Sequence, residues 1–198
     1  MDSKTPHSQP TIETYLGLVP EIDETAYIAS TAAIMGAVRI GPDCSIWHNG
    51  TLRGDANYIT IGRGSNIQDN SVVHIDSRTM PTIIGEYVTV GHGAIIHACT
   101  LHDRAFVGMG AIVLDGAVVE SGAMVAAGAL VPPGKRVPAG ELWAGSPAKF
   151  MRALDGEAQK RFSQTAHSYI EFGRAARLGL EGGPYTFDPI PLPPRDEC

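Results

Sequence analysis

The sequence contains few aromatic residues, few cysteines and no long apolar run. Aromatic side chains make up 7% of the 198 residues, so a core has to be filled by many small and β-branched side chains. Cys44, Cys99 and Cys198 lie far apart, which is no disulfide framework and favours a reducing compartment, the cytoplasm or a matrix-like one. No stretch reaches the roughly 18–20 apolar residues that span a bilayer. The net charge is −6 without a basic run, so we expect neither a membrane nor a nucleic-acid partner.

Aliphatic residues recur every six residues through the middle of the chain. The repeat positions are Ile22, Ile28, Ile34, Ile40, Ile46, Leu52, Ile61, Ile67, Val73, Ile84, Val90, Ile96, Leu101, Val107, Val113, Val119, Val125 and Val131. This period is typical of the hexapeptide repeat, in which three flat walls form one triangular coil of a parallel β-helix. We therefore predict an all-β fold, a parallel β-helix whose repeat residues point inward and stack coil on coil. Because known hexapeptide folds are left-handed, we expect a left-handed parallel β-helix.

Two further residue types follow the repeat positions. Small residues such as Ala94 and Ala111 come four residues after most of them, and we expect these to fit the tight corners. Glycines directly follow several repeat positions, where we expect positive φ angles; they are Gly41, Gly62, Gly85, Gly91 and Gly108. Three steps depart from six: Leu52 to Ile61, Val73 to Ile84 and Ile96 to Leu101. Such irregular steps map to loops, often on the binding side.

The repeat divides the chain into three parts. We assign residues 1–17 to an N-terminal extension, 18–150 to the β-helix domain, and 151–198 to a C-terminal helix and tail. The apolar spacing from Asp155 to Leu180 predicts an amphipathic helix that packs along one wall. The segment "PYTFDPIPLPP" carries five prolines in eleven residues, so we expect an extended tail.

Two histidines occupy equivalent places in the repeat. His74 directly follows Val73 and His97 directly follows Ile96, and these repeat positions are three steps apart. Their separation of 23 residues (97 − 74) is one coil of eighteen plus five extra residues in the loop 75–83. We therefore expect both side chains at the same position on adjacent coils, about 4.8 Å apart at the backbone. Arg53 follows Leu52 and is expected one coil below His74.

A third histidine belongs to the preceding wall. His92 follows Val90 by two residues, and Gln68 and Asp69 are expected one coil below it. A corner separates His92 from the other two histidines, so one chain cannot easily close a site of three ligands. Prisms packed around a threefold axis would bring the His92 wall of one chain to the other pair on the next. Three histidines with an open fourth position are typical of catalytic zinc, which predicts a homotrimer with metal sites at its interfaces.

Three motifs carry a resemblance to a known family. The segments "LRGD" (52–55), "NIQDNSVVH" (66–74) and "VGHGAIIHAC" (90–99) resemble the signature of the gamma-class carbonic anhydrases, over about residues 18–150. The resemblance implies reversible hydration of CO₂ to bicarbonate by a metal-bound hydroxide. The implied metal is Zn²⁺, with Fe²⁺ and Co²⁺ as alternatives, and its implied ligands are His74, His92 and His97.

The resemblance also implies roles for six neighbouring residues. Arg53 and Asp55 would form an ion pair at the interface near the site. Gln68 would orient the hydroxide, and Asp69 would support a ligand histidine from behind. Asn66 would be a further pocket residue, and Tyr169 on the predicted helix would match a pocket tyrosine.

The sequence departs from the archaeal pattern of this family in its acidic residues. Ala56 follows Asp55 where that pattern has a glutamate, and the loop 75–83 contains no glutamate. The chain is more similar to a short-loop bacterial branch. Because a general acid–base relay contributes about 10²–10⁴-fold to a rate, we expect slow CO₂ hydration.

Other interpretations of the same repeat stay open. The segment "AGSPAKFMR" (144–152) resembles the exit segment of acyl-CoA-dependent acetyltransferases, so the alternative is a hexapeptide-repeat acyltransferase or a CoA thioesterase. Such an enzyme would use a histidine as general base and need no cluster of three ligands. A non-catalytic assembly subunit is a third class. We expect His7, His48, His102 and His167 outside the ligand set, and Cys99 as a buried thiol.

Overall fold

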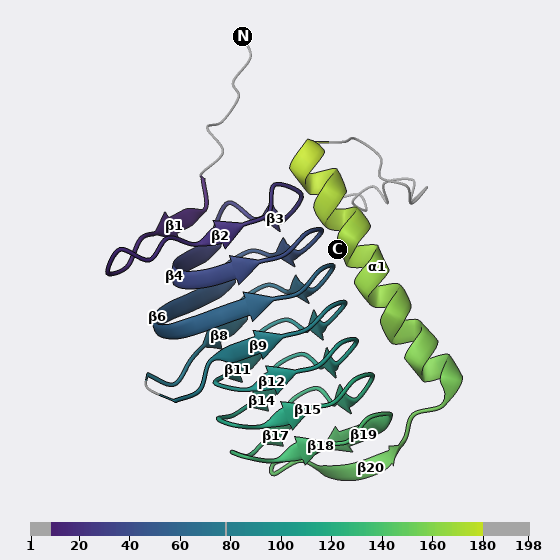
Figure 1. Ribbon diagram of the computed structural model, residues 1–198. Helices are drawn as coiled ribbons and strands as arrows, with labels where there is room; N and C mark the ends of the chain where they lie inside the picture. The colour runs from purple at the N-terminus through teal and green to yellow at the C-terminus, as the bar shows by residue number, and fades with distance from the viewer. Residues whose placement is uncertain (1–8, 78, 180–198) are drawn as a thin grey trace, which may run out of the picture.

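The computed structural model describes residues 9–77 and 79–179. Within them the chain forms a parallel β-solenoid followed by one α-helix, as Figure 1 shows. This confirms the predicted all-β fold of hexapeptide repeats with a C-terminal helix. The predicted proline-rich tail, His7 and Cys198 lie outside the described residues.

The solenoid has three walls, which we name A, B and C. Walls A and B form one sheet because two long strands, β4 and β6, bend around the corner between them. Wall A contains β1 (Thr11–Glu13), the first parts of β4 (Ala33–Ile40) and β6 (Thr51–Ile61), β8 (Val72–His74), β11 (Ile95–His97), β14 (Ile112–Val113) and β17 (Leu130–Val131). Wall B contains β2 (Glu21–Ile22), the second parts of β4 and β6, β9 (Thr82–Ile84), β12 (Thr100–Leu101), β15 (Val118–Val119) and β18 (Arg136–Val137).

Wall C is a separate sheet. It contains β3 (Tyr27–Ile28), β5 (Ser45–Ile46), β7 (Asn66–Ile67), β10 (Thr89–Val90), β13 (Phe106–Val107), β16 (Met124–Val125), β19 (Glu141–Ala144) and β20 (Lys149–Ala153). The strands pair in parallel except at the end, where β20 folds back antiparallel on β19. This turn ends the solenoid and directs the chain toward the helix.

The predicted repeat positions form the core. Strand pairing aligns Val73 with Ile96 on wall A, as the counting of coils predicts. Every repeat position from Ile34 to Val131 is at most 2% exposed. Burying each such side chain contributes about 1.5–3 kcal/mol, so the stack of inward aliphatic residues dominates the stability. The repeat count omits the inward pair Val38 and Ile59, which lies where β4 and β6 turn the corner.

The prediction about the glycines that follow repeat positions was wrong. None of the five has a positive φ. They are glycines because the next coil approaches too closely for a side chain: a Cβ on Gly108 would lie 2.4 Å from the backbone nitrogen of Ala127. Positive φ angles occur at other turn positions, including Asn70 and Gly110.

The helix α1 (Gly156–Leu178) packs along wall C, as predicted. The side chain of Asp155 caps its N-terminus by accepting a hydrogen bond of 2.8 Å from the backbone nitrogen of Ala158. Gly173 allows a close approach to Ser45 and Tyr27 on the wall. Among the described residues, no helix is long and apolar enough to cross a membrane.

We predict that the substitution Gly108→Ala lowers the free energy of unfolding by about 1–3 kcal/mol, because the new methyl group must displace the adjacent coil. Gly156→Ala is the matched control: a Cβ at Gly156 would meet no neighbouring atom within 4 Å, and this glycine has no positive φ. Urea unfolding followed by circular dichroism measures both. Equal stabilities of the two variants would contradict the role assigned to coil approach.

Candidate metal centre

His74 and His97 lie side by side on wall A. Strand pairing places them opposite each other on adjacent coils. Nδ1 of His74 is 3.2 Å from Nε2 of His97, and the ring centroids are 5.1 Å apart. The predicted register of this pair is confirmed, while its role as a ligand pair stays a prediction.

A carboxylate and a guanidinium lie below His74. Arg53 pairs with His74 one coil down and forms an ion pair with Asp55. Asp55 Oδ1 is 3.2 Å from His74 Nε2. Burial lowers the pKa of His74, and the charge of Arg53 adds to this effect against the opposing hydrogen bond to Asp55. His74 is therefore neutral at pH 7, the protonation state in which an imidazole binds a metal.

Asp55 stays ionised in this arrangement. Burial raises its pKa, but the hydrogen bond with His74 and the charge of Arg53 together outweigh burial, so its pKa lies below the ordinary value. The carboxylate therefore accepts from His74 Nε2 and from Arg53 at once.

A second carboxylate, Asp115, contacts His97. Asp115 Oδ1 and His97 Nδ1 form a hydrogen bond. The sequence analysis did not identify Asp115, although it lies in the turn that follows Val113, the partner of Ile96 on the next coil. Counting one more coil upward from His97 gives the signal that would have found it.

His92 lies in the turn between β10 and β11, at the corner between walls C and A. The repeat count predicts His92 on the preceding wall, which is wall C. In the structure it lies at the corner at the end of that wall. Its Nδ1 is 2.9 Å from Asp69 Oδ2. The backbone bond from Gly93 nitrogen to Asp69 oxygen puts the two turns on adjacent coils, as predicted.

Gln68 and Asn66 form a buried amide chain beside this corner. Gln68 is 5% exposed, and its Nε2 donates to Asn66 Oδ1 at 3.1 Å. Asn66 Nδ2 in turn donates to Thr89 Oγ1 at 3.0 Å. These bonds fix the Gln68 amide so that its Oε1 is the acceptor available to a ligand. Thr89 is a supporting residue that the sequence analysis did not identify.

Tyr169 of α1 joins an aromatic cluster on wall C. It packs edge-on against Trp47 with ring centroids 5.6 Å apart, and Trp47 contacts Tyr27 at 5.2 Å. Burial, and then the negative charge of Asp69, raise the pKa of both tyrosines. Their hydroxyl groups therefore stay protonated at neutral pH. The charge of Asp69, the carboxylate that binds His92, acts on both.

The donor set fits a metal ion. All three histidines have a carboxylate on one ring nitrogen, which leaves the other nitrogen as an electron-pair donor. Two ligand bonds of about 2.0–2.1 Å in tetrahedral geometry put their nitrogens roughly 3.3–3.4 Å apart, close to the 3.2 Å between His74 and His97. Within the described part of one chain, no three His, Cys, Asp or Glu residues come together as a metal site.

The other described histidines and Cys99 lie outside this set. His48 Nδ1 is 3.0 Å from Thr31 Oγ1. His102 is exposed beyond β12, and His167 of α1 packs against Tyr87. Burial raises the pKa of the Cys99 thiol to about 12, so it stays protonated at neutral pH.

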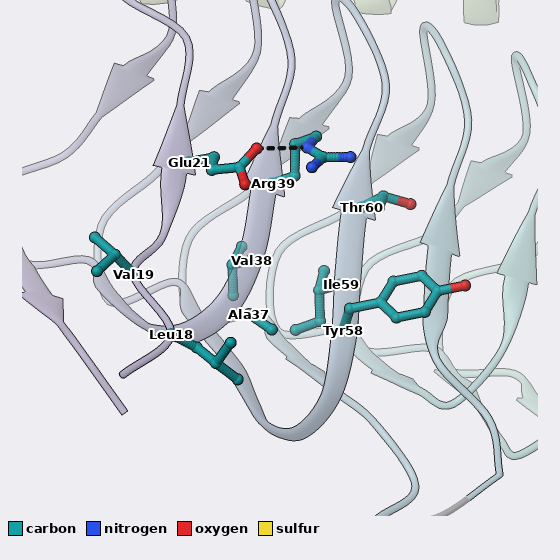
Figure 2. A pocket seen from close by; sticks show the side chains of 9 residues that line it. All are labelled: Leu18, Val19, Glu21, Ala37, Val38, Arg39, Tyr58, Ile59 and Thr60. Carbon is teal, nitrogen blue, oxygen red and sulfur yellow. Dashed lines mark hydrogen bonds and ion pairs between the residues drawn. The ribbon is translucent and has the colours of Figure 1, made fainter. Parts of the chain in front are cut away.

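A groove of about 470 Å³ lies on wall B. Figure 2 shows Leu18 and Tyr58 at its apolar side and the ion pair of Glu21 with Arg39 at its other end. None of the predicted site residues lines it, so the groove is separate from the histidine cluster.

Comparisons with known proteins agree with the motifs. Gamma carbonic anhydrase 2, a mitochondrial protein of Arabidopsis thaliana, is 51% identical over 160 residues, which are 78% of this chain and 58% of that protein. A probable carbonic anhydrase of Methanocaldococcus jannaschii is 50% identical over 150 residues, 76% of this chain and 94% of that protein. The matched region thus spans under two thirds of the plant protein and nearly all of the archaeal one.

Structural comparison gives the same fold. A crystal structure of a hexapeptide transferase family protein from Anaplasma phagocytophilum superposes with a TM-score of 0.80 at 50% identity, covering 83% of this chain and 97% of that one. A scan against models of known protein families gives no match. On the strength of its relatives, the chain belongs to the gamma carbonic anhydrase family.

Proposed function

We propose that the protein is a metal-dependent carbonic anhydrase of the gamma class, which hydrates CO₂ reversibly to bicarbonate. The observation that carries the proposal is the facing pair His74 and His97, with a carboxylate on the outer nitrogen of each ring. The third ligand would be His92 of a neighbouring chain, itself held by Asp69. Zn²⁺ is the metal we propose, with Fe²⁺ and Co²⁺ as alternatives.

The residues of the chain have separate tasks in this reaction. When bound, the ion supplies the Lewis acidity that lets water ionise near neutral pH. Gln68 offers a fixed amide oxygen that can accept a hydrogen bond from the attacking water and orient it. Asp55 and Arg53 hold His74 at its outer nitrogen. Asn66 fixes Gln68, and Tyr169 would be a pocket residue near Asp69, whose charge acts on it.

A homotrimer would complete the site. His92 is at a corner, whereas His74 and His97 are on wall A, and within the described part of one chain the three do not come together as a metal site. Wall A also exposes an apolar column beside the histidines, in which Val72 and Ile95 stack with 38% and 39% exposure. A neighbouring chain that brings its His92 to this wall would cover the column, and a cyclic trimer repeats the contact three times.

The two buried free thiols, Cys44 and Cys99, support the proposed location in a reducing compartment such as the cytoplasm.

The acyltransferase alternative has less support from the site. Acyl transfer to an acceptor hydroxyl or amine requires one general base, and it does not explain why three histidines each have a carboxylate. Lys149 and Arg152, which that alternative would place near CoA phosphates, are exposed on β20. Metal content distinguishes the two functions.

We expect His74→Ala, His92→Ala and His97→Ala each to abolish zinc binding in protein purified without chelator. Each variant should remain folded, because the core consists of stacked aliphatic residues and removal of a surface side chain costs no more than about 1 kcal/mol. His102→Ala is the control, since His102 lies away from the cluster. Zinc bound at wild-type level by any of the three variants would remove that histidine from the ligand set.

Mixed trimers test whether the ligands come from two chains. We expect either variant expressed alone to lack zinc. Mixed trimers of His74→Ala and His92→Ala chains should regain about a third of the wild-type zinc, because every mixed cyclic trimer has one interface of three that pairs an intact wall A with an intact His92. Two affinity tags select the mixed species, and light scattering confirms the trimer. No regain in verified mixed trimers would contradict the shared site.

CO₂ hydration should be slow and should rise with imidazole buffer. Position 56 is an alanine and the loop 75–83 contains no glutamate, so the chain lacks the acidic residues expected to export the proton. Loss of a proton relay lowers a rate by about 10²–10⁴-fold. Stopped-flow hydration at increasing imidazole measures this, with a buffer of similar pKa but greater bulk as control. A fast rate independent of buffer would show that another group exports the proton.

A further inference from the structure

We propose that Asp115 is a positioning residue that fixes the tautomer of His97 and directs its Nε2 toward His74. The inference rests on the proposed function, because it assigns Asp115 a task in metal binding. Asp115 does not contact a substrate in this account; it acts through His97.

The backbone around Asp115 is anchored to the coil of His97. Gly116, with φ of 66°, donates its backbone N–H to Ala98 oxygen at 2.7 Å. Asp115 oxygen accepts a bond of 2.8 Å from Gly134 nitrogen on the following coil. The carboxylate therefore projects from a turn that is held from both sides.

The chemistry of the two groups determines which nitrogen of His97 carries the proton. An ionised carboxylate can only accept a hydrogen bond, so a neutral His97 must carry its proton on Nδ1. Its Nε2 then presents a lone pair to His74 Nδ1 at 3.2 Å. His74, with its Nε2 on Asp55, presents a lone pair in return. Two facing lone pairs repel unless a cation lies between them, so both carboxylates prepare the pair for a metal.

Asp115 forms its side-chain hydrogen bond with His97. Asp55 divides its oxygens between His74 and Arg53, whereas the one side-chain hydrogen bond of Asp115 within the described residues goes to His97. A change at Asp115 should therefore alter His97 without disturbing a second ion pair.

The test uses Asp115→Asn, which keeps the shape, and Asp115→Ala, which removes the acceptor. The matched control is Asp103→Asn: Asp103 follows its inward residue Leu101 by two, as Asp115 follows Val113, but it binds the backbone of Glu86. We expect zinc affinity, measured by competition with a chromogenic chelator, to fall about 10–100-fold in both Asp115 variants and to stay at the wild-type value in the control.

A second readout needs no metal. Nitrogen NMR of the imidazole groups in metal-free protein should show His97 protonated on Nδ1 in the wild type, and a shift toward Nε2 protonation in Asp115→Ala. An unchanged tautomer together with unchanged zinc affinity would overturn the proposal. Should the wild type bind no zinc, the proposed function fails, and the NMR spectra still decide whether Asp115 fixes His97. Should Asp115→Ala not fold, the isosteric Asp115→Asn decides by its zinc affinity, and a wild-type affinity would overturn the proposal.

Discussion

Stacking of inward aliphatic side chains on adjacent coils is the constraint on which the rest of the structure depends. It fixes the length of each coil and therefore also the positions of the outward side chains. Val73 and Ile96 pair in the core, so His74 and His97 must pair outside it. Because the core supplies most of the stability of the fold, the outer face of wall A can carry polar residues at little cost in stability.

The site arises from a repeated pairing of histidine with aspartate across coils. Asp69 binds His92 from one coil below, and Asp115 binds His97 from one coil above. Burial lowers the pKa of His74 and keeps it neutral. The protein thus places a carboxylate behind each of the three imidazoles, the combination that favours binding of a divalent cation.

The periodicity predicted the fold, the register of His74 on His97, and the position of His92 above Asp69, because one count of coils determines all of them. It did not predict contacts made from the turns. The count aligns Val113 with Ile96, but Asp115 lies two residues after Val113 and His97 one residue after Ile96, so their contact depends on the path of the turn. The glycines after repeat positions were misjudged because the sequence does not show how closely successive coils approach. The chain that would supply His92 is a neighbour. The sequence of one chain indicates that neighbour only indirectly, because it shows a corner between His92 and the other two histidines.

The most direct test is anomalous X-ray diffraction at the zinc edge, from crystals of protein purified without chelator. A site shared between chains predicts a peak at every interface, bonded to His74 and His97 of one chain and His92 of the next. A metal bound by one chain alone, or a fully loaded protein with its metal elsewhere, would contradict the account.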